Sequence, residues 1–333
     1  MTIVNDQLAV VMVALHDGFY GCGTGAGQSN RAFLRVLAGL LAPAVRLVVL
    51  PVRLVSSSSE YDPEWHQQTL TILADTSADV VPVDNGTAGL TRFGGLESFR
   101  AASASAAASI SRRLPRTSPV LIAAFDVPFF GLAPLLPSQA RPSLVNIARA
   151  TAALQAPRDR ERIAWERAGL QATAAAGGHI AATSRHIRDH LTTAYRIPQP
   201  AITDLTNGLT RAEQNPGPAQ PLDTRLLPAA AEHGFLLSFG RAEPYKGFDD
   251  LLDALHLLRT SGMRVPHTIL AAVTDGPPLT AYQRHLARRI DAGHLDVTLH
   301  TTFSLRIRSL LGHPALVGVV VPSRGEPFGR IPL

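Results

Sequence analysis

Residues 235–255 of the chain read FLLSFGRAEPYKGFDDLLDAL. An apolar run gives way to glycine and two cations, and a spaced apolar pattern follows them. The apolar residues of that pattern recur at helical spacing and share one face: Phe248, Leu251, Leu252 and Leu255. The stretch therefore predicts a strand, a loop and the N-terminus of an amphipathic helix.

The loop in this stretch carries two different cations, Arg241 and Lys246. Lys246 is the only lysine in 333 residues, although Lys and Arg together number 31. Arginine presents a planar fork of donors, whereas lysine is a point charge on a flexible stem. Because both lie beside exposed helix N–H groups, the loop is suited to receive an anion such as a phosphate. A capped surface helix with incidental charges is the alternative interpretation.

The composition describes a globular protein with two domains. The hydrophobic content is 46% and the charged content 17%, which is typical of a compact chain. A length of 333 residues exceeds one ordinary core and favours two domains of roughly 150 residues each. The net charge of +5 comes from scattered arginines, so a nucleic-acid partner is not indicated.

The sequence also favours a cytoplasmic location. A lone cysteine, Cys22, cannot form an intramolecular disulfide and fits a reducing compartment. The first residues lack the features of a signal peptide. No uninterrupted apolar run approaches 18 residues, so no transmembrane segment is expected.

The first half of the chain alternates strand-like and helix-like stretches. Strands are predicted at 8–15, 45–54, 80–83, 120–124, 180–184 and 201–205, and helices from about 29 and at 64–73, 97–114, 158–176 and 185–191. The serine-rich loop at 56–62 is expected to be mobile. Strands that are apolar throughout and alternate with helices favour a parallel sheet covered on both faces.

A proline-rich stretch separates this half from a second one. Residues 213–221 hold Pro216, Pro218 and Pro221, and the alternation restarts at 235 with further strands expected at 267–273, 297–300 and 316–321 and helices at 248–259, 282–290 and 304–311. We predict an α/β protein with an N-terminal domain at 1–212, a linker at 213–232 and a C-terminal domain at 233–333. Both domains are expected to be Rossmann-like and to face each other across a cleft, with ligands outside the carboxyl ends of the strands.

A glycine-dense loop follows the first strand. Residues 21–26 fit the dinucleotide pattern G-x-G-x-x-A. The loop begins five residues after His16, and no acidic residue closes the second strand, which ends at Arg53-Leu54. A nicotinamide-dependent oxidoreductase is therefore the weaker alternative, and glycines that let the backbone approach a ligand are favoured.

The sequence shows neither a Walker loop nor a D-x-D pair. His186 and His190 are spaced four apart on a predicted helix, among charged residues that favour a solvated face over a metal site. We therefore expect a metal-independent protein without a cofactor. An acidic residue such as Glu326, in a first helical turn, is by itself more typical of a dipole partner than of a catalytic group.

Several motifs of the second half together resemble the nucleotide-sugar glycosyltransferases of the GT-B fold, family 4. They are Ser238-Phe239-Gly240-Arg241, Lys246-Gly247, Thr274-Asp275-Gly276 and Pro322-Ser323-Arg324-Gly325-Glu326-Pro327-Phe328-Gly329, with Thr206-Asn207-Gly208 at the link between domains. The resemblance is strongest over 180–333. It is weaker before that, where the glycine loop looks like the family's phosphate and acceptor loop. The resemblance implies that the domain at 1–212 is the acceptor side and that the domain at 233–333 binds the nucleotide sugar.

The resemblance implies roles for individual residues. Arg241 and Lys246 would hold the donor's diphosphate, and Glu326 would contact the hydroxyls of the transferred sugar. Other donor-binding positions implied are Phe328, Gly329, Arg330, Gly25 and Gly27. The family often has a histidine after the strand that ends at Phe125-Asp126, so that contact is lost here or passes to Asp126, the second catalytic candidate. The acceptor-binding residues are left open.

The resemblance further implies a retaining glycosyltransferase that moves a sugar from a nucleoside diphosphate donor to the hydroxyl of a small-molecule acceptor. The glycine loop is similar to those of enzymes of antibiotic or other secondary metabolism. The family's next glutamate would be residue 334, so the resemblance implies a second domain truncated at Leu333. A catalytically inactive relative that binds nucleotide sugars is the other alternative.

Overall fold

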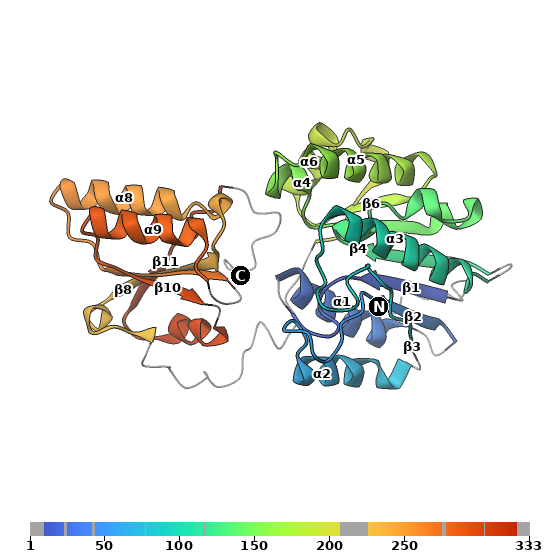
Figure 1. Cartoon of the computed structure of the whole chain (residues 1–333), viewed down its shortest axis with the longest axis horizontal. Helices are drawn as coiled ribbons and strands as arrows, with labels where there is room; N and C mark the ends of the chain where they lie inside the picture. The colour runs from blue at the N-terminus through green and yellow to red at the C-terminus, as the bar shows by residue number, and fades with distance from the viewer. Residues whose placement is uncertain are drawn as a thin grey trace. The chain divides into compact units, whose positions relative to one another are not determined.

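The computed structural model describes residues 10–22, 25–41, 44–76, 78–115, 118–206, 226–274, 278–302 and 304–324. The chain divides into two compact units, Met1–Leu209 and Thr210–Leu333 (Figure 1). Of the predicted positions, 207–208, 213–225, 275–276 and 326–330 lie outside the described residues. Within the described ranges, no helix is both long and apolar enough to cross a membrane.

The first unit is built on a seven-stranded sheet. Its strands are β1 (Val10–Leu15), β2 (Arg46–Pro51), β3 (Asp79–Val80), β4 (Val120–Phe125), β5 (Leu144–Ala148), β6 (His179–Ala182) and β7 (Ile202–Asp204). They lie in the order β3-β2-β1-β4-β5-β6-β7, and all the pairs are parallel. The chain order reverses between β1 and β4, which marks the place where such sheets bind ligands at their carboxyl edge.

Helices cover both faces of this sheet. They are α1 (Gly25–Leu40), α2 (Pro63–Leu73), α3 (Leu96–Ser111), α4 (Ala152–Gln155), α5 (Arg160–Ala175) and α6 (Arg185–Ala194). Alternate residues of β1 enter two different cores. Met12 packs with Ala106 and Ile110 of α3, whereas Val13 packs with Leu34 of α1. Burial on both faces explains why β1 is apolar throughout.

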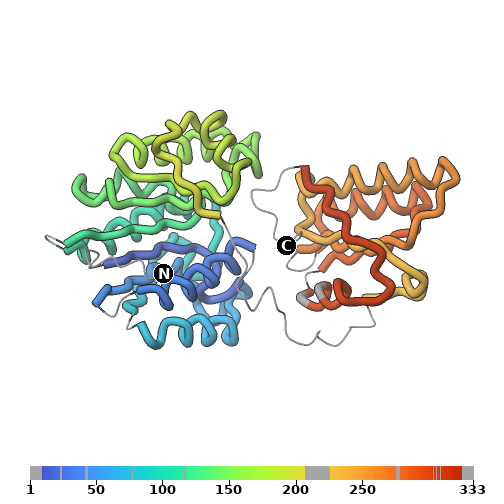
Figure 2. Tube along the Cα trace, turned by 180° about the vertical axis from the view of Figure 1, so that it is seen from behind, coloured from blue at the N-terminus to red at the C-terminus, as the bar shows by residue number. Residues whose placement is uncertain are grey.

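The second unit is a four-stranded parallel sheet in the order β10-β9-β8-β11. Its elements are β8 (Phe235–Arg241), a 3₁₀ turn at Pro244–Lys246, α8 (Phe248–Thr260), β9 (His267–Thr274), α9 (Ala281–Ala292), β10 (Val297–Thr302), a 3₁₀ segment at Leu305–Gly312 and β11 (Leu316–Val319). Figure 2 shows the trace of this unit from behind, coloured from yellow-orange to red along the chain. The predicted apolar face of α8 is confirmed, since Phe248, Leu251, Leu252 and Leu255 are all buried. The parallel α/β architecture predicted for the chain is likewise confirmed.

Some sequence predictions differ from the structure. Helix α1 begins at Gly25 and not near residue 29, and the segment predicted as an α-helix at 304–311 is 3₁₀. Strand β5 was not predicted, because its five residues include the polar Asn146 and follow Arg141-Pro142. The loop at 56–62 is anchored and not free, since the Ser58 hydroxyl donates to the Leu90 carbonyl at 2.7 Å.

Candidate functional site

Two acid–base side chains lie at the reversal point of the first sheet. His16 follows β1 and Asp126 follows β4, and these two strands are neighbours. His16 Nδ1 lies 3.7 Å from Asp126 Oδ2, and the two side chains are only 3% and 6% exposed. Asp126 has a φ of 68°, a strained backbone conformation for a residue other than glycine. Such strain is typical of functional sites, where the surrounding structure maintains it.

A buried arginine approaches the same aspartate. Arg149 comes just after β5, and its Nη1 lies 3.4 Å from Asp126 Oδ2. The same nitrogen donates to the side-chain oxygen of Asn30 on α1. Asn30 in turn donates to the backbone carbonyl of Asp17 at 2.9 Å. The cluster of His16, Asp126, Arg149 and Asn30, which we call the switch-point cluster, thus joins elements from three strand ends and one helix.

The switch-point cluster contains polar atoms with unused hydrogen-bonding capacity. His16 Nδ1 and Asp126 Oδ1 are buried and have no hydrogen-bond partner among the described residues. Burial lowers the pKa of His16, and the nearby carboxylates of Asp126 and Asp17 only partly oppose this. His16 is therefore neutral near pH 7. A buried polar atom without a partner calls for an explanation, and a hydroxyl-bearing ligand is a chemical match for these two.

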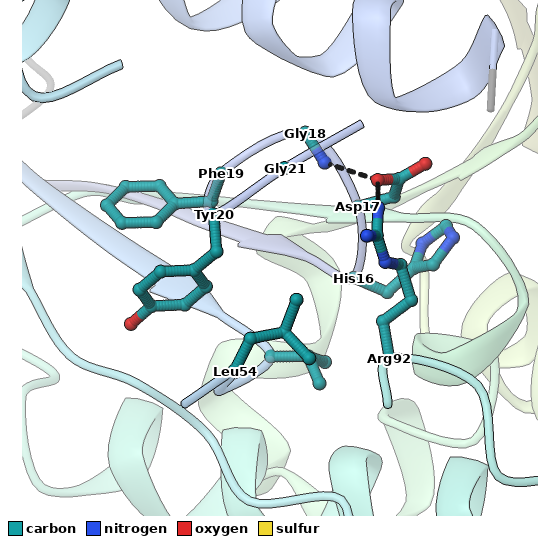
Figure 3. A pocket seen from close by; sticks show the side chains of 9 residues that line it. His16, Asp17, Gly18, Phe19, Tyr20, Gly21, Leu54 and Arg92 are labelled. Atoms are coloured by element: carbon teal, nitrogen blue, oxygen red, sulfur yellow. Dashed lines mark hydrogen bonds and ion pairs between the residues drawn. The ribbon is translucent and has the colours of Figure 1, made fainter. Parts of the chain in front are cut away.

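A second network, which contains the buried Asp17–Arg92 pair drawn in Figure 3, joins the loops beside the switch-point cluster. Arg92 pairs with the Asp17 carboxylate, and its Nε donates to Glu60 Oε2 at 2.9 Å. Burial opposes the positive charge of Arg92, but Asp17 and Glu60 hold its pKa above the usual value. Because Asp17 follows β1, Glu60 lies beyond β2 and Arg92 lies beyond β3, this arginine joins the three loops at one edge of the sheet.

The glycines predicted to bind donor phosphate lie in the first turn of α1. A Cβ on Gly27 would come within 2.5 Å of Asp17 Oδ2, so only glycine allows this contact. A carboxylate of the chain itself therefore lies beside Gly27. The donor-binding roles of Gly25 and Gly27 stay predictions.

The two predicted cations of the second unit lie at the carboxyl end of β8. Arg241 ends the strand, is exposed and donates from Nη2 to the Tyr245 hydroxyl at 3.3 Å. Lys246 closes the following 3₁₀ turn, and its Nζ lies 5.3 Å from the centre of the Tyr245 ring. Tyr245 therefore lies next to both cations.

The segment after β11 folds against this loop. Gly247 has a φ of 68°, and a Cβ on it would lie 2.0 Å from the Pro322 carbonyl oxygen. The backbone N–H of Arg324 donates to the Tyr245 carbonyl at 2.9 Å. Two bonds from Arg324, at 2.7 and 2.5 Å, reach the Asp250 carboxylate and lower the pKa of Asp250. The chain is thus directed past Lys246 just before Glu326, which lies outside the described residues together with Phe328, Gly329 and Arg330.

The sequence alone points to Asp126 but not to His16, Asp17, Arg92 and Arg149 as site residues. His16 and Asp17 carry a usable signal, because they directly follow a buried strand. Arg149 was not singled out because β5, the strand that it follows, was not predicted. Of the two histidines predicted on a solvated helix face, His186 is exposed, whereas His190 is half-buried and its Nε2 is hydrogen-bonded to the Thr151 hydroxyl at 2.8 Å.

Comparisons with known proteins give a local sequence match and a wide structural one. No family model matches the chain. The chain is 33% identical over 103 residues to the uncharacterized glycosyltransferase YqgM of Bacillus subtilis (strain 168), and this match spans 31% of the chain and 27% of that protein. The chain thus spans about a quarter of the length of this curated relative.

Solved structures match almost the whole chain. Sucrose-phosphate synthase from Thermosynechococcus elongatus superposes with a TM-score of 0.62 at 17% identity, over 98% of this chain and 78% of that one. Anabaena Alr3699/HepE in complex with UDP and glucose gives 0.62 at 16% identity, over 96% and 76%. The E. coli trehalose-6-phosphate structure bound with UDP-2-fluoro glucose gives 0.60 at 11% identity, over 96% and 80%. The chain therefore has an α/β fold of parallel sheets that matches GT-B glycosyltransferase structures.

Proposed function

We propose that the protein is a retaining glycosyltransferase that moves a sugar from a nucleoside diphosphate donor to a hydroxyl of a small-molecule acceptor. The observation that carries the proposal is the loop after β8, where Arg241 and the sole lysine flank Tyr245 and the segment leading to Glu326 folds against them. The local match to YqgM and the shared fold support the same reaction class. Since two matching structures hold UDP or a UDP sugar, we propose a uridine diphosphate donor.

In this proposal the second unit stabilises the leaving group. Negative charge grows on the diphosphate as the bond to the sugar's C1 breaks, and Arg241, Lys246 and the α8 N-terminus offset it. Preorganised charge of this kind usually contributes more to catalysis than any other single effect, and it needs no metal ion. The acceptor hydroxyl then attacks C1 from the face that the diphosphate leaves, and its proton passes to a leaving phosphate oxygen.

The carboxylates are assigned to the transferred sugar. Asp126 would accept a hydrogen bond from a sugar hydroxyl at its buried, unpartnered Oδ1, and the neutral imidazole of His16 supplies a second polar contact. Glu326 would contact further hydroxyls, as the resemblance implies. An acceptor from antibiotic or other secondary metabolism, and a cytoplasmic location, belong to the same proposal.

Calorimetric titration of the full-length protein with UDP tests the donor site. The parent should bind UDP, Lys246→Ala should weaken binding by at least tenfold, as about 1.4 kcal/mol of lost charge pairing requires, and Arg259→Ala should not. Arg259 is the matched control, since it is an exposed cation at the far end of the same helix α8. Equal binding by parent and Lys246→Ala would overturn the donor assignment. UDP binding without transfer from any UDP sugar would instead favour the inactive relative.

A further inference from the structure

Three carboxylates are buried among the residues that the structure describes, and one of them lies outside the networks treated above. Asp17 and Asp126 belong to the networks at the reversal point of the first sheet, whereas Glu166 lies on α5 and is 0% exposed. A buried carboxylate is costly, and apolar side chains of similar volume often stabilise a core equally well or better. Stability alone is therefore a weak reason for a glutamate at this position.

Glu166 binds the segment that follows β5. Its Oε2 accepts from the backbone N–H of Ala152 at 2.8 Å and from the Tyr195 hydroxyl at 2.5 Å, and its Oε1 accepts from Arg162 Nε at 2.8 Å. The Tyr195 hydroxyl also accepts from the backbone N–H of Ala153 at 3.2 Å, and the Tyr195 side chain is fully buried. Glu166 and Tyr195 thus hold two consecutive N–H groups at the start of α4. We call these two side chains the α4 anchor.

Helix α4 is short enough to take its position from such contacts. It has four residues, too few for a helix to be stable on its own. Its N-cap residue, Thr151, makes no capping hydrogen bond, and the Thr151 hydroxyl is instead hydrogen-bonded to His190 Nε2 at 2.8 Å. The α4 anchor therefore supplies the partners that an N-cap side chain supplies in most helices.

The segment that the α4 anchor holds begins with Arg149 of the switch-point cluster. Strand β5 ends at Ala148, so Arg149 is the first residue beyond the hydrogen-bonded ladder. Its side chain is 7% exposed, and its Nη1 lies 3.4 Å from Asp126 Oδ2. Ala152 follows only three residues after Arg149. A fixed start of α4 therefore restricts the path of the chain between strand and helix, and with it the direction of the Arg149 side chain.

We infer that Glu166 and Tyr195 are positioning residues, which hold Arg149 against Asp126 through the start of α4. Both act through the backbone and not by contact with the substrate. The consequence for sugar transfer rests on the proposed function, in which Asp126 binds the transferred sugar, but the positioning of Arg149 does not. A displacement of about 1 Å far from the reacting atoms can lower a rate by about 10²-fold, so this support matters for catalysis.

The titration of His16 reports on the place of Arg149 without any substrate. Burial is the main cause that lowers the pKa of His16, and the carboxylates of Asp126 and Asp17 oppose it. The guanidinium groups of Arg92 and Arg149 lower this pKa further. When Arg149 moves away, a cation that opposes protonation of the ring is lost, so the pKa of His16 should rise.

Proton NMR of the full-length protein over a range of pH measures this change. Tyr195→Phe removes only the hydroxyl of the α4 anchor, and His16 should then titrate at a higher pH than in the parent. The signal of His16 is identified by its absence in His16→Gln. If Tyr195→Phe does not fold, Thr151→Val takes its place and the same rise is expected, because this variant removes the hydrogen bond between the same segment and His190.

Thr173→Val is the matched control. Thr173 is a buried residue of the same helix α5, and its hydroxyl accepts from Asn146 Nδ2 of the same strand β5 at 2.8 Å. The variant removes a buried hydroxyl between these two elements without touching the start of α4. It should destabilise the protein and leave the titration of His16 as in the parent.

The effect on the reaction is measured separately. Tyr195→Phe should lower the kcat of sugar transfer by about tenfold to 10²-fold, because the groups that meet the sugar are misplaced. Its affinity for UDP should equal that of the parent, since the diphosphate is assigned to the second unit. Thr173→Val should keep the parent values of both.

Two results would overturn the positioning of Arg149: a His16 that titrates in Tyr195→Phe as in the parent, or an equal rise in Thr173→Val, which would mark a general loss of stability. The proposed function fails separately. If the titration shifts as expected but the parent neither binds UDP nor uses UDP sugars, the positioning stands and the transferase proposal falls. If Tyr195→Phe transfers sugar at the parent rate, the donor site stands and the role of the α4 anchor in transfer falls.

Discussion

At the scale of single residues, Lys246 makes the sharpest prediction. The chain uses arginine at every other basic position, which suggests that this position requires the shape of lysine and not only its charge. Lys246→Ala is expected to slow sugar transfer by about 10²-fold to 10³-fold, the usual effect of removing one charge-stabilising donor. Lys246→Arg should also slow transfer, because a planar fork cannot replace a point charge against a diphosphate, but by somewhat less than Lys246→Ala does. Steady-state kinetics that show Lys246→Arg at the parent rate would leave the phosphate role to Arg241 alone.

His16 makes a prediction about pH. Its pKa is lowered in the folded protein by burial, so the unfolded chain takes up a proton first as the pH falls. The stabilising effect of the neutral buried ring is complete above pH 6.5, the ordinary value, and is lost as the pH decreases from there. The free energy of unfolding of His16→Gln should therefore fall less steeply below pH 6.5 than that of the parent. Denaturant titrations at several pH values measure this, with the exposed His186→Gln as control. Parallel profiles of His16→Gln and parent would contradict it.

At the scale of elements, the packing of the segment after β11 against Gly247 can be tested by a single substitution. Gly247 and Gly262 both have positive φ values, 68° and 72°, at the two ends of α8, but a Cβ would meet other atoms within 4 Å only at Gly247, the Pro322 carbonyl among them. Gly262→Ala should cost about 1 kcal/mol from backbone strain alone. Gly247→Ala should cost roughly 3 kcal/mol, because strain and a backbone clash add. Equal losses in denaturant unfolding would mean that the segment after β11 does not pack on Gly247.

In the first unit, substitution of Arg92 tests whether this residue joins the loops after β1, β2 and β3. Arg92→Met leaves the Asp17 carboxylate buried without its charge partner, which should cost about 3–5 kcal/mol. Arg46→Met is the matched control, since Arg46 pairs with Asp79 at the surface, and should change stability by less than about 1 kcal/mol. Thermal and denaturant unfolding measure both variants. Similar losses would show that Arg92 does not join the loops after β1, β2 and β3.

Sequence patterns predict some of the helices and strands and miss others. Apolar runs locate β1, β2, β4 and β8 within a few residues, because strands buried on both faces are apolar throughout. Strand β5 escapes detection, since Asn146 interrupts its pattern while donating to the Thr173 hydroxyl at 2.8 Å. Helix α1 begins at Gly25, and Gly27 in its first turn lies close to the Asp17 carboxylate, a proximity that no local pattern encodes.

Some residues of the candidate site can likewise be predicted from the sequence, and others cannot. Arg241, Lys246 and Asp126 can be named from the sequence because each follows a recognisable strand. The pairing of His16 with Asp126 cannot, since it depends on β1 lying beside β4 although more than 100 residues separate them along the chain.

At the scale of the whole molecule, each of the two units is built on a parallel sheet, and each has its candidate groups at the carboxyl ends of its strands. In the first unit these groups are the switch-point cluster, and in the second unit they are Arg241 and Lys246. The proposed reaction assigns the acceptor and the sugar contacts to the first unit and the diphosphate to the second. The fold itself, shared with GT-B glycosyltransferase structures, permits this division without establishing the substrates.

Proton NMR of the full-length protein, mixed with UDP sugars and a panel of small hydroxyl-bearing acceptors, tests the proposed glycosyl transfer most directly. We predict that the donor's anomeric signal decays, that UDP forms in equal amount, and that a new anomeric signal of the same configuration grows in. Lys246→Ala should show the same signals at a rate lower by about 10²-fold or more. UDP sugars that stay intact with every acceptor, in a protein that is folded, would contradict glycosyl transfer as the activity of this chain.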